Sequence, residues 1–218
     1  TNSPFEIAAL DGNANSASIA VNDALTFGAG ATATIAGSIH VSGSFRAAVT
    51  PTLSGALYQD MNPNCVCNQA NLLNIAGLIQ ARASDNDNAA AQLTASSLND
   101  FTSQTLSLDC GRYYFDRVSS NGDLQIEARG RIALFIAGDL GISGTLTLAL
   151  QSEASAEIFV LGNMSVGGPL ELSTTTDGNR VLLAVNGTGT LNLAGAVIDG
   201  SIYAPRAEIV TRGPFELN

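Results

Sequence analysis

The chain has 218 residues, of which 19 are acidic and nine basic, so its formal net charge is -10. Charged residues make up only 13% of the chain, about half the usual share for a globular protein. The acidic balance disfavours nucleic acid and anionic lipid as partners, and the absence of lysine excludes Schiff-base, Ser/Lys and P-loop chemistry.

The first 49 residues predict a set of short β-strands. Apolar and polar residues alternate over four to seven positions and are separated by Gly, Asn and Asp, which favour turns. The expected strands are FEIAAL, ASIAV, ATATI, GSIHV and GSFRAAV. We expect residues 1–49 to form rungs that are less regular than those of the second half.

Residues 50–104 predict a helical insertion, because the strand pattern is absent there. Leu72, Ile75 and Ile79 are spaced as on one face of a helix, and a similar pattern follows from Ala90 to Phe101. We expect one helix over 69–83 and a second over 88–100. The first would lie along the flank of the strands and cover an apolar face, although a lid or binding insertion is an alternative.

Residues 105–218 contain an internal repeat. Residues 133–148 align without a gap with 157–172, so that Phe135 matches Phe159. A glycine followed by two alternating apolar residues recurs at nearly equal intervals, at Gly122, Gly144, Gly168, Gly189 and Gly213. This period predicts a mainly β, right-handed β-solenoid with about 21–24 residues per coil and a flanking helical insertion. An antiparallel sandwich would show the alternation but not the constant period.

The repeat predicts two interior stacks. One would contain Leu124, Leu146, Leu170, Leu191 and Phe215. The other would contain Ile126, Leu148, Leu172, Leu193 and Leu217.

The order of these segments resembles a known superfamily. β segments are followed by a helix, a CGRYYF strand at residues 110–115, the glycine-started coils and a GSIYAP segment at 200–205. This layout is similar to the discontinuous β-solenoids of the bacterial ice-binding-like superfamily and to related repeat domains of surface and pilus-associated proteins, most clearly over residues 88–218. The resemblance implies a single rod-like domain with a flanking helix, in which N-terminal strands pack against late coils.

Three cysteines cannot all pair within one chain. In a secreted protein we expect Cys110 to form a disulfide with Cys65 or Cys67, which would tie the helical insertion to the coils. The remaining thiol is either buried or joined to another subunit. A zinc site that includes His40 has no supporting spacing, and we expect no metal or cofactor.

No catalytic group emerges from the pattern. Glu171 and Glu216 would point outward at a separation near that of inverting glycosidases, but two solvated charges explain them more simply. Asp85 and Asp87 alternate like calcium ligands, yet they lack EF-hand spacing and are expected to cap the second helix. His40, the single histidine, is expected to be an exposed side chain.

The expected function is therefore structural and non-catalytic. We expect a protein of the bacterial cell surface, secreted after removal of a leader and not inserted in the membrane, that self-associates into a filament or adhesive matrix. The terminal strands would join subunits through Phe5, Ile7, Leu10, Phe215 and Leu217, unless the N-terminal strand covers the C-terminal edge of its own chain. The alternatives are a module that binds ice or glycan and a polysaccharide-active enzyme. Proline and glutamate at outward positions interrupt the threonine ladder that ice binding would favour.

Overall fold

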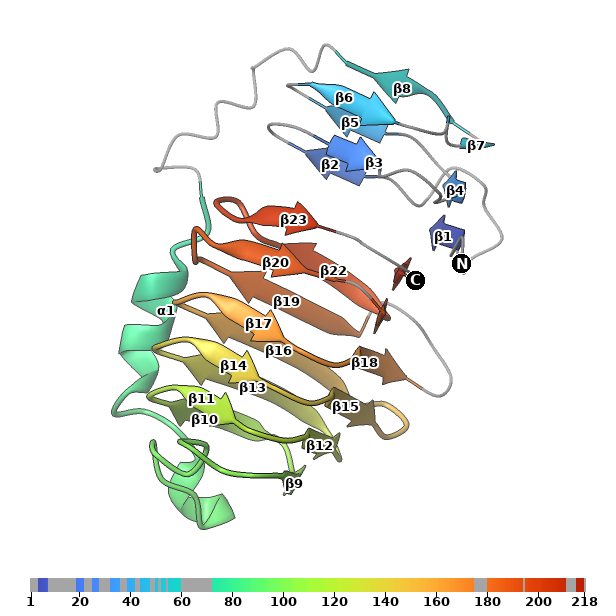
Figure 1. Ribbon diagram of the computed structural model, residues 1–218. Coiled ribbons are helices and arrows are strands. Elements are labelled where there is room, and N and C mark those ends of the chain that lie inside the picture. Colours follow the sequence, from blue (N-terminus) through green and yellow to red (C-terminus); the bar gives the residue numbers. More distant parts are fainter. Residues whose placement is uncertain are drawn as a thin grey trace. The chain divides into compact units, whose positions relative to one another are not determined.

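The computed structural model is a β-solenoid of parallel strands, which confirms the predicted fold class (Figure 1). It describes residues 4–7, 19–21, 25–27, 32–35, 39–41, 44–47, 50, 52–53, 55–59, 72–174, 180–193, 195–210 and 215–217. Contacts divide the chain into two compact units, Thr1–Leu73 with Thr211–Asn218, and Asn74–Val210. None of the helices in these ranges is long and apolar enough to span a lipid bilayer.

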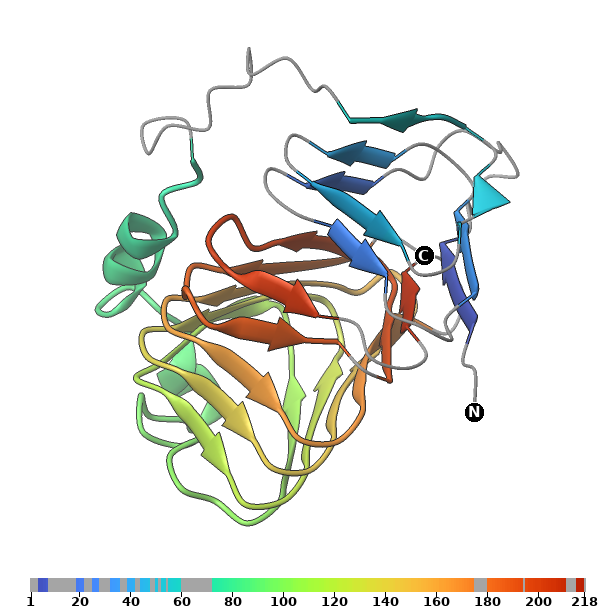
Figure 2. The same cartoon turned by 45° about the horizontal axis from the view of Figure 1, so that its top comes forward.

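Three parallel sheets form the sides of the second unit, and Figure 2 shows its successive coils nested one behind another. Within this unit, sheet A comprises β9 (Gln104–Leu108), β12 (Leu124–Ala128), β15 (Leu146–Leu150), β18 (Leu170–Thr174) and β21 (Ala196–Ile198). Sheet B consists of β10 (Gly111–Phe115), β13 (Arg131–Ile136), β16 (Ser155–Val160), β19 (Val181–Val185) and β22 (Gly200–Tyr203). Sheet C consists of β11 (Val118–Ser120), β14 (Leu140–Ile142) and β17 (Met164–Val166), and β20 (Thr190–Asn192) pairs separately with β23 (Glu208–Val210).

The register of these strands confirms the sequence repeat. Phe135 pairs with Phe159 in sheet B and Leu146 with Leu170 in sheet A, as the gapless alignment predicts. Along sheet A, the step from one rung to the next grows with each coil, from the β9–β12 pair to the β18–β21 pair. The first coil is therefore shorter, and the last of these coils longer, than the predicted range.

The predicted interior stacks are wrong at their fourth members. Leu170 pairs with Ala196 and Leu172 with Ile198, so Leu191 and Leu193 do not continue the two columns. Leu191 is buried, but it belongs to β20 and pairs with Ile209. The prediction failed because the motif at Gly189 follows the preceding motif at the spacing expected for sheet A. The coil that contains it is longer, so the motif forms β20, and the sheet A strand β21 comes after it.

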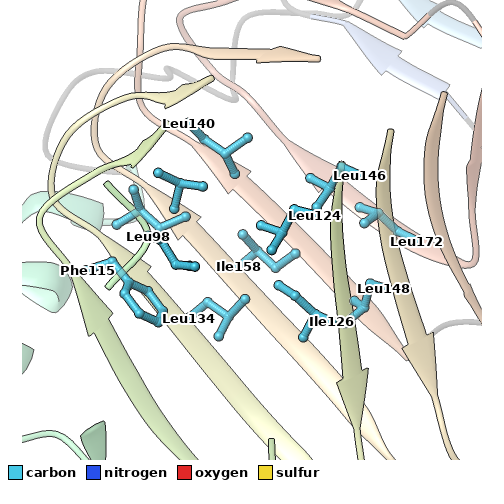
Figure 3. A pocket seen from close by; sticks show the side chains of 12 residues that line it. Leu98, Phe115, Leu124, Ile126, Leu134, Leu140, Leu146, Leu148, Ile158 and Leu172 are labelled. Carbon is cyan, nitrogen blue, oxygen red and sulfur yellow. The ribbon is translucent and has the colours of Figure 1, made fainter. Parts of the chain in front are cut away.

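The interior of the second unit is filled with aliphatic side chains from all three sheets (Figure 3). Leu124, Leu146 and Leu172 converge there with residues of sheets B and C, each of the three at most 2% exposed. The space left between them is a cavity of about 10 Å³ lined by apolar atoms. A cavity this small without polar partners holds neither a ligand nor an ordered water molecule, so any contact surface of this unit lies on its outside.

Glycine is required where one turn lies directly on the next. A Cβ atom on Gly168 would stand 2.8 Å from the backbone carbonyl carbon of Gly144, and one on Gly144 would stand 2.8 Å from that of Gly122. Next to this column, the Asp123 side chain accepts a hydrogen bond from the Thr145 N–H at 2.8 Å. A carboxylate of one coil thus satisfies the backbone of the next.

The same device recurs at another corner of the coil. Asp139 Oδ1 accepts a hydrogen bond from the N–H of Asn163 at 2.8 Å, and Asn163 Oδ1 accepts one from the N–H of Gly189 at 2.9 Å. The Asp or Asn that follows the turn glycine is the sequence signal of this ladder. Reasoning from the sequence alone missed it.

Helix α1 (Ile75–Arg82) covers the outer face of sheet B, as predicted, although it is shorter than the expected 69–83. Ile75 and Ile79, each 1% exposed, pack against Phe135 and Phe159. The two phenylalanine rings stack with centroids 5.2 Å apart, and the Arg82 guanidinium lies 5.9 Å from the centre of the Phe135 ring. Aromatic residues at equivalent positions of adjacent rungs therefore form the platform on which the helix rests.

The second predicted helix, over 88–100, is wrong. Only the 3-10 helix η2 (Asn88–Ala91) forms, after which Gln92 and Asp100 adopt left-handed backbone angles with φ of 57° and 56°. The Ser97 hydroxyl accepts a hydrogen bond from the Thr94 N–H at 2.8 Å, a local bond that competes with helix formation. The apolar spacing arises instead because Leu98, 1% exposed, plugs the end of the interior.

This segment is an end cap for the first coil. The N–H of Asp116 donates to the carbonyl oxygen of Ala95, and the N–H of Ser119 donates to that of Leu98, both at 2.9 Å. Phe101 then bridges in parallel to Ser120. The cap therefore satisfies the edge of β11, which would otherwise be unpaired.

The first unit repeats the three-sided arrangement with shorter strands. Within this unit, the strands pair in parallel in the orders β7-β4-β1-β24, β2-β5-β8 and β3-β6. The strands are β1 (Pro4–Ile7), β2 (Ile19–Val21), β3 (Leu25–Phe27), β4 (Thr32–Ile35), β5 (Ile39–Val41), β6 (Phe45–Ala47), β7 (Thr52–Leu53), β8 (Leu57–Tyr58) and β24 (Phe215–Leu217). β7 and β8 lie where the sequence predicted no strand, because such short runs do not show alternation.

We predict that Gly168→Ala destabilises the second unit by about 1–3 kcal/mol, because the new methyl group would meet backbone atoms of the previous turn. Gly141→Ala is the matched control, since its Cβ would find only the Ser165 hydroxyl, at 3.8 Å. The control should change the free energy of unfolding by less than about 1 kcal/mol. Urea unfolding followed by circular dichroism measures both, and equal effects would contradict the close stacking of the turns.

Candidate functional site

The outer face of sheet A is the broadest regular surface of the second unit that no described element covers. Two ladders of outward side chains run across it. Thr105, Gln125, Thr147, Glu171 and Val197 occupy one ladder in register, and Ser107, Glu127 and Ala149 occupy the second. All are exposed or half-exposed, so the face presents mainly polar side chains, with Ala149 and Val197 as apolar members, on rungs about 4.8 Å apart.

The polar groups of this face are partly tied to one another. The Thr147 hydroxyl donates to Glu171 Oε2 at 3.4 Å, which orients that carboxylate along the ladder. Among the described residues, the ion pairs formed by arginine involve neither Glu127 nor Glu171. The face therefore combines hydroxyl and amide groups with two carboxylates that have no arginine partner among the described residues.

A second polar cluster joins the end cap to β10. Arg82 forms an ion pair with Asp85, and Arg112 Nη1 lies 3.3 Å from the same carboxylate. Asp87 does not cap a helix as predicted; its Oδ2 accepts a hydrogen bond from the Arg112 N–H at 2.7 Å. The carboxylates of Asp85 and Asp87 are each paired with an arginine. The cluster therefore has a structural role, since it holds this segment against β10.

Asn88 completes the covering of β10. It is 5% exposed, its Nδ2 donates to the carbonyl oxygen of Tyr114 at 2.6 Å, and its Oδ1 accepts from the Tyr114 N–H at 2.9 Å. The side-chain amide thus replaces the peptide group of a neighbouring strand.

Two tyrosines beside this cluster have shifted titration. Burial raises the pKa of Tyr113 above its ordinary value of 10.0, and the carboxylates of Asp109 and Asp87 raise it further. Burial also raises the pKa of Tyr114, with Asp116 as the second cause. Both shifts keep the phenols neutral, and the Tyr113 hydroxyl donates to the carbonyl oxygen of Asp109 at 3.0 Å.

The candidate residues suggested by the sequence are divided between the two units. Glu171 lies on sheet A beside Thr147, whereas Glu216 belongs to the first unit and is in register with Glu6. The backbone of His40 pairs with Ala20 in the first unit, and its side chain lies outside the described residues. No cluster of three His, Cys, Asp or Glu side chains suited to a metal occurs among the residues that the structure describes.

Of the predicted assembly residues, four lie in one strand pair. Phe5 is in register with Phe215, and Ile7 with Leu217, because β1 pairs in parallel with β24 of the same chain. Leu10 lies outside the described residues. This pairing is the alternative that the sequence left open, in which the N-terminal strand covers the C-terminal strand of the same chain.

The cysteine pairing remains a prediction. Cys110 is exposed between β9 and β10, and its sulfur fills the space that a Cβ on Gly130 would need. Cys65 and Cys67 lie outside the described residues.

A family model described as "Domain of unknown function (DUF7305)" matches residues 66–217. No curated protein matches the chain. Among solved structures, the chain is similar to one described as "Crystal structure of an ice binding protein from an Antarctic Biological Consortium", with a TM-score of 0.41 and 20% identity. That similarity covers 96% of this chain and 90% of the other.

We predict that Cys110 is disulfide-bonded to Cys65 or Cys67 in material from an oxidising compartment. The bond would stabilise the chain by roughly 3–4 kcal/mol, because it closes a loop of more than forty residues. Non-reducing peptide mapping should find the crosslinked peptide, and Cys110→Ser should lower the midpoint of thermal unfolding only when the wild type is oxidised. Finding Cys110 alkylated in native material would contradict the bond.

Proposed function

The chain belongs to the DUF7305 family, and we propose that it is a non-catalytic, extracellular β-solenoid module that acts by surface contact. Its contact surface is the outer face of sheet A, and its ligand is an extended surface glycan. The observation that carries the proposal is the pair of in-register polar ladders on that face.

The three sides of the second unit differ in what they can offer. Sheet B is occupied by α1, and the interior is filled by apolar side chains. Sheet C presents Ser119, Gly141 and Ser165 along its outward line, which leaves little to recognise. The β20–β23 pair also presents a hydroxyl, an amide and a carboxylate, through Thr190, Asn192 and Glu208, but over two rungs only. Sheet A offers these three kinds of group on in-register strands of several successive coils.

A glycan fits this array better than ice. Sugar hydroxyls donate readily to carboxylates and exchange hydrogen bonds with amides, and a linear polysaccharide can lie along a ladder of polar rungs. Ice binding favours a regular, weakly polar ladder, whereas Gln125, Glu127 and Glu171 interrupt the small residues Thr105, Thr147 and Ala149. Ice remains the alternative ligand, supported by those small residues.

Self-association into a filament is the second candidate function, and the β1–β24 pair supports it. These strands come from opposite ends of the sequence and pair in parallel over three residues. The same register can form between two chains if β1 is exchanged, and repeated exchange in one direction gives an open fibre.

We predict that Thr147→Tyr weakens glycan binding by about tenfold or more, because a large ring would rise from the centre of the ladder and separate the ligand from the face. Ser165→Tyr, at an exposed position on sheet C, is the matched control and should bind normally. Pull-down with insoluble cellulose, chitin and peptidoglycan measures binding, and ice-affinity partitioning tests the alternative.

The same samples test the absence of catalysis. Reducing ends should not accumulate with any of these polysaccharides, and Glu171→Gln should leave the fold intact. Release of sugar by the wild type, lost in Glu171→Gln, would overturn the non-catalytic assignment.

For the filament, we predict that deleting residues 1–10 abolishes assembly and leaves a folded second unit, because β1 is removed while all residues of the second unit remain. Light scattering and negative-stain microscopy of both proteins at rising concentration measure this. A full-length protein that stays monomeric throughout would rule out the filament and leave the contact module.

A further inference from the structure

The end of the second unit at which its coils begin carries three outermost strands, β9, β10 and β11. The cap covers two of them: Asp87 and Asn88 hydrogen-bond the backbone of β10, and the segment from Ala95 to Phe101 bonds β11. β9 is the outermost strand of sheet A and pairs only with β12 among the described strands.

The backbone of β9 shows which groups face outward at this edge. The N–H of Gln104 donates to the backbone carbonyl oxygen of Asp123 at 3.0 Å, and the carbonyl oxygen of Leu108 accepts from the backbone N–H of Arg129 at 2.9 Å. These residues therefore face β12, and because a strand alternates, the N–H and C=O groups of Thr105 and Ser107 face away from it. This is the pattern of donors and acceptors that a further strand would bond.

The strand carries none of the devices that usually protect such an edge. Its sequence is QTLSL, without a charge, a proline or an inward-facing polar group at its centre. It stays in register with β12 over all five residues, so no bulge bends it away. At the same end, the Asn88 side chain bonds β10 and the segment from Ala95 to Phe101 bonds β11. The outer edge of β9 differs, because no residue in the described part of the chain bonds it.

The cap also limits what can occupy this edge. A second solenoid stacked end to end would need its own strands under β10 and β11, where Asp87, Asn88, Leu98 and Phe101 already lie. A single extended strand needs only the place beside β9. The geometry thus excludes a second copy stacked coil on coil and admits one isolated strand.

We propose that β9 accepts one extended segment of another polypeptide by strand addition. Outward side chains of that segment would follow Thr105 and Ser107 on the outer face, and its inward side chains would be apolar like Leu106. Ser107 is small and lies beside Glu127 in register, so a lysine or arginine opposite Ser107 can reach that carboxylate. The partner is therefore an alternating apolar and polar segment with an outward basic residue.

The test uses two synthetic peptides of the sequence Thr-Val-Thr-Val-Xaa-Val-Thr-Val-Thr, with Xaa as Lys or as Glu. Binding to the full chain is measured by NMR titration, and amide hydrogen exchange locates it. We expect the Lys peptide to bind at least about fivefold more tightly than the Glu peptide, and to slow exchange at Thr105 and Ser107.

Two variants separate strand addition from other contacts. Thr105→Pro with Ser107→Pro removes the two outward N–H groups without touching the bonds to β12, and should abolish binding while circular dichroism stays unchanged. If that variant unfolds, Ser107→Lys, which places a charge at the edge and repels the Lys peptide, gives the same answer. Thr147→Tyr, which blocks the face but not the edge, should bind the peptide normally and so separates this proposal from glycan binding.

Peptide binding that survives the substitutions in β9, binding without slowed exchange at Thr105 and Ser107, or no binding of the Lys peptide would each overturn the proposal. Dimers of the full chain that disappear in the proline variant would also overturn it, because they would make a second copy the occupant.

Discussion

The constraint on which this structure depends is the parallel alignment of each coil with the next at a spacing of about 4.8 Å. Strands meet that spacing easily, whereas turns meet it only where one backbone can lie directly on another. Gly122, Gly144 and Gly168 form such a column, and the Asp123 side chain supplies the acceptor that the next turn needs. The apolar stacks of the interior then follow, because equal register brings equal positions together.

The same constraint divides the molecule into surfaces with different uses. A residue repeated at one outward position becomes a column, so Phe135 and Phe159 build an aromatic platform that binds α1. Small residues at the outward positions of sheet C form a column with few side-chain groups for a ligand to contact. Polar residues on sheet A build a ladder, which is why its outer face, rather than any pocket, is the proposed contact surface.

The repeat made the fold predictable, because period and alternation are both visible in the sequence. It could not show that the coil from Leu170 to Ala196 is longer than those before it, since a longer turn leaves the motif at Gly189 looking like its predecessors. The apolar spacing from Ala90 to Phe101 gave a wrong helix prediction for another reason. Leu98 is buried because it closes the end of the interior, and a residue in that place is apolar just as a residue on a buried helix face is.

The outward residues of the candidate face were also predictable, but its edge was not. Alternation identified Gln125, Thr147 and Glu171 as outward residues, and their register confirms that they share one ladder. β9 was missed as a rung because no glycine begins it. Its open edge depends on which backbone groups the cap leaves unbonded, and the sequence pattern carries no signal for that.

Faces and edges of a solenoid recognise partners by different physics, and this chain offers both. A ligand on the outer face of sheet A would contact side chains, so its affinity would sum over many weak contacts, and a single bulky substitution such as Thr147→Tyr would disturb several of them. The edge of β9 acts through backbone N–H and C=O groups, which are directional and are removed one at a time by proline. The cap keeps the two kinds of surface distinct, because it bonds β10 and β11, whereas β9 pairs with β12 alone among the described strands. The proposed polymer would therefore contact side chains along the coils, and the proposed polypeptide strand would bond backbone groups at the edge where the coils begin.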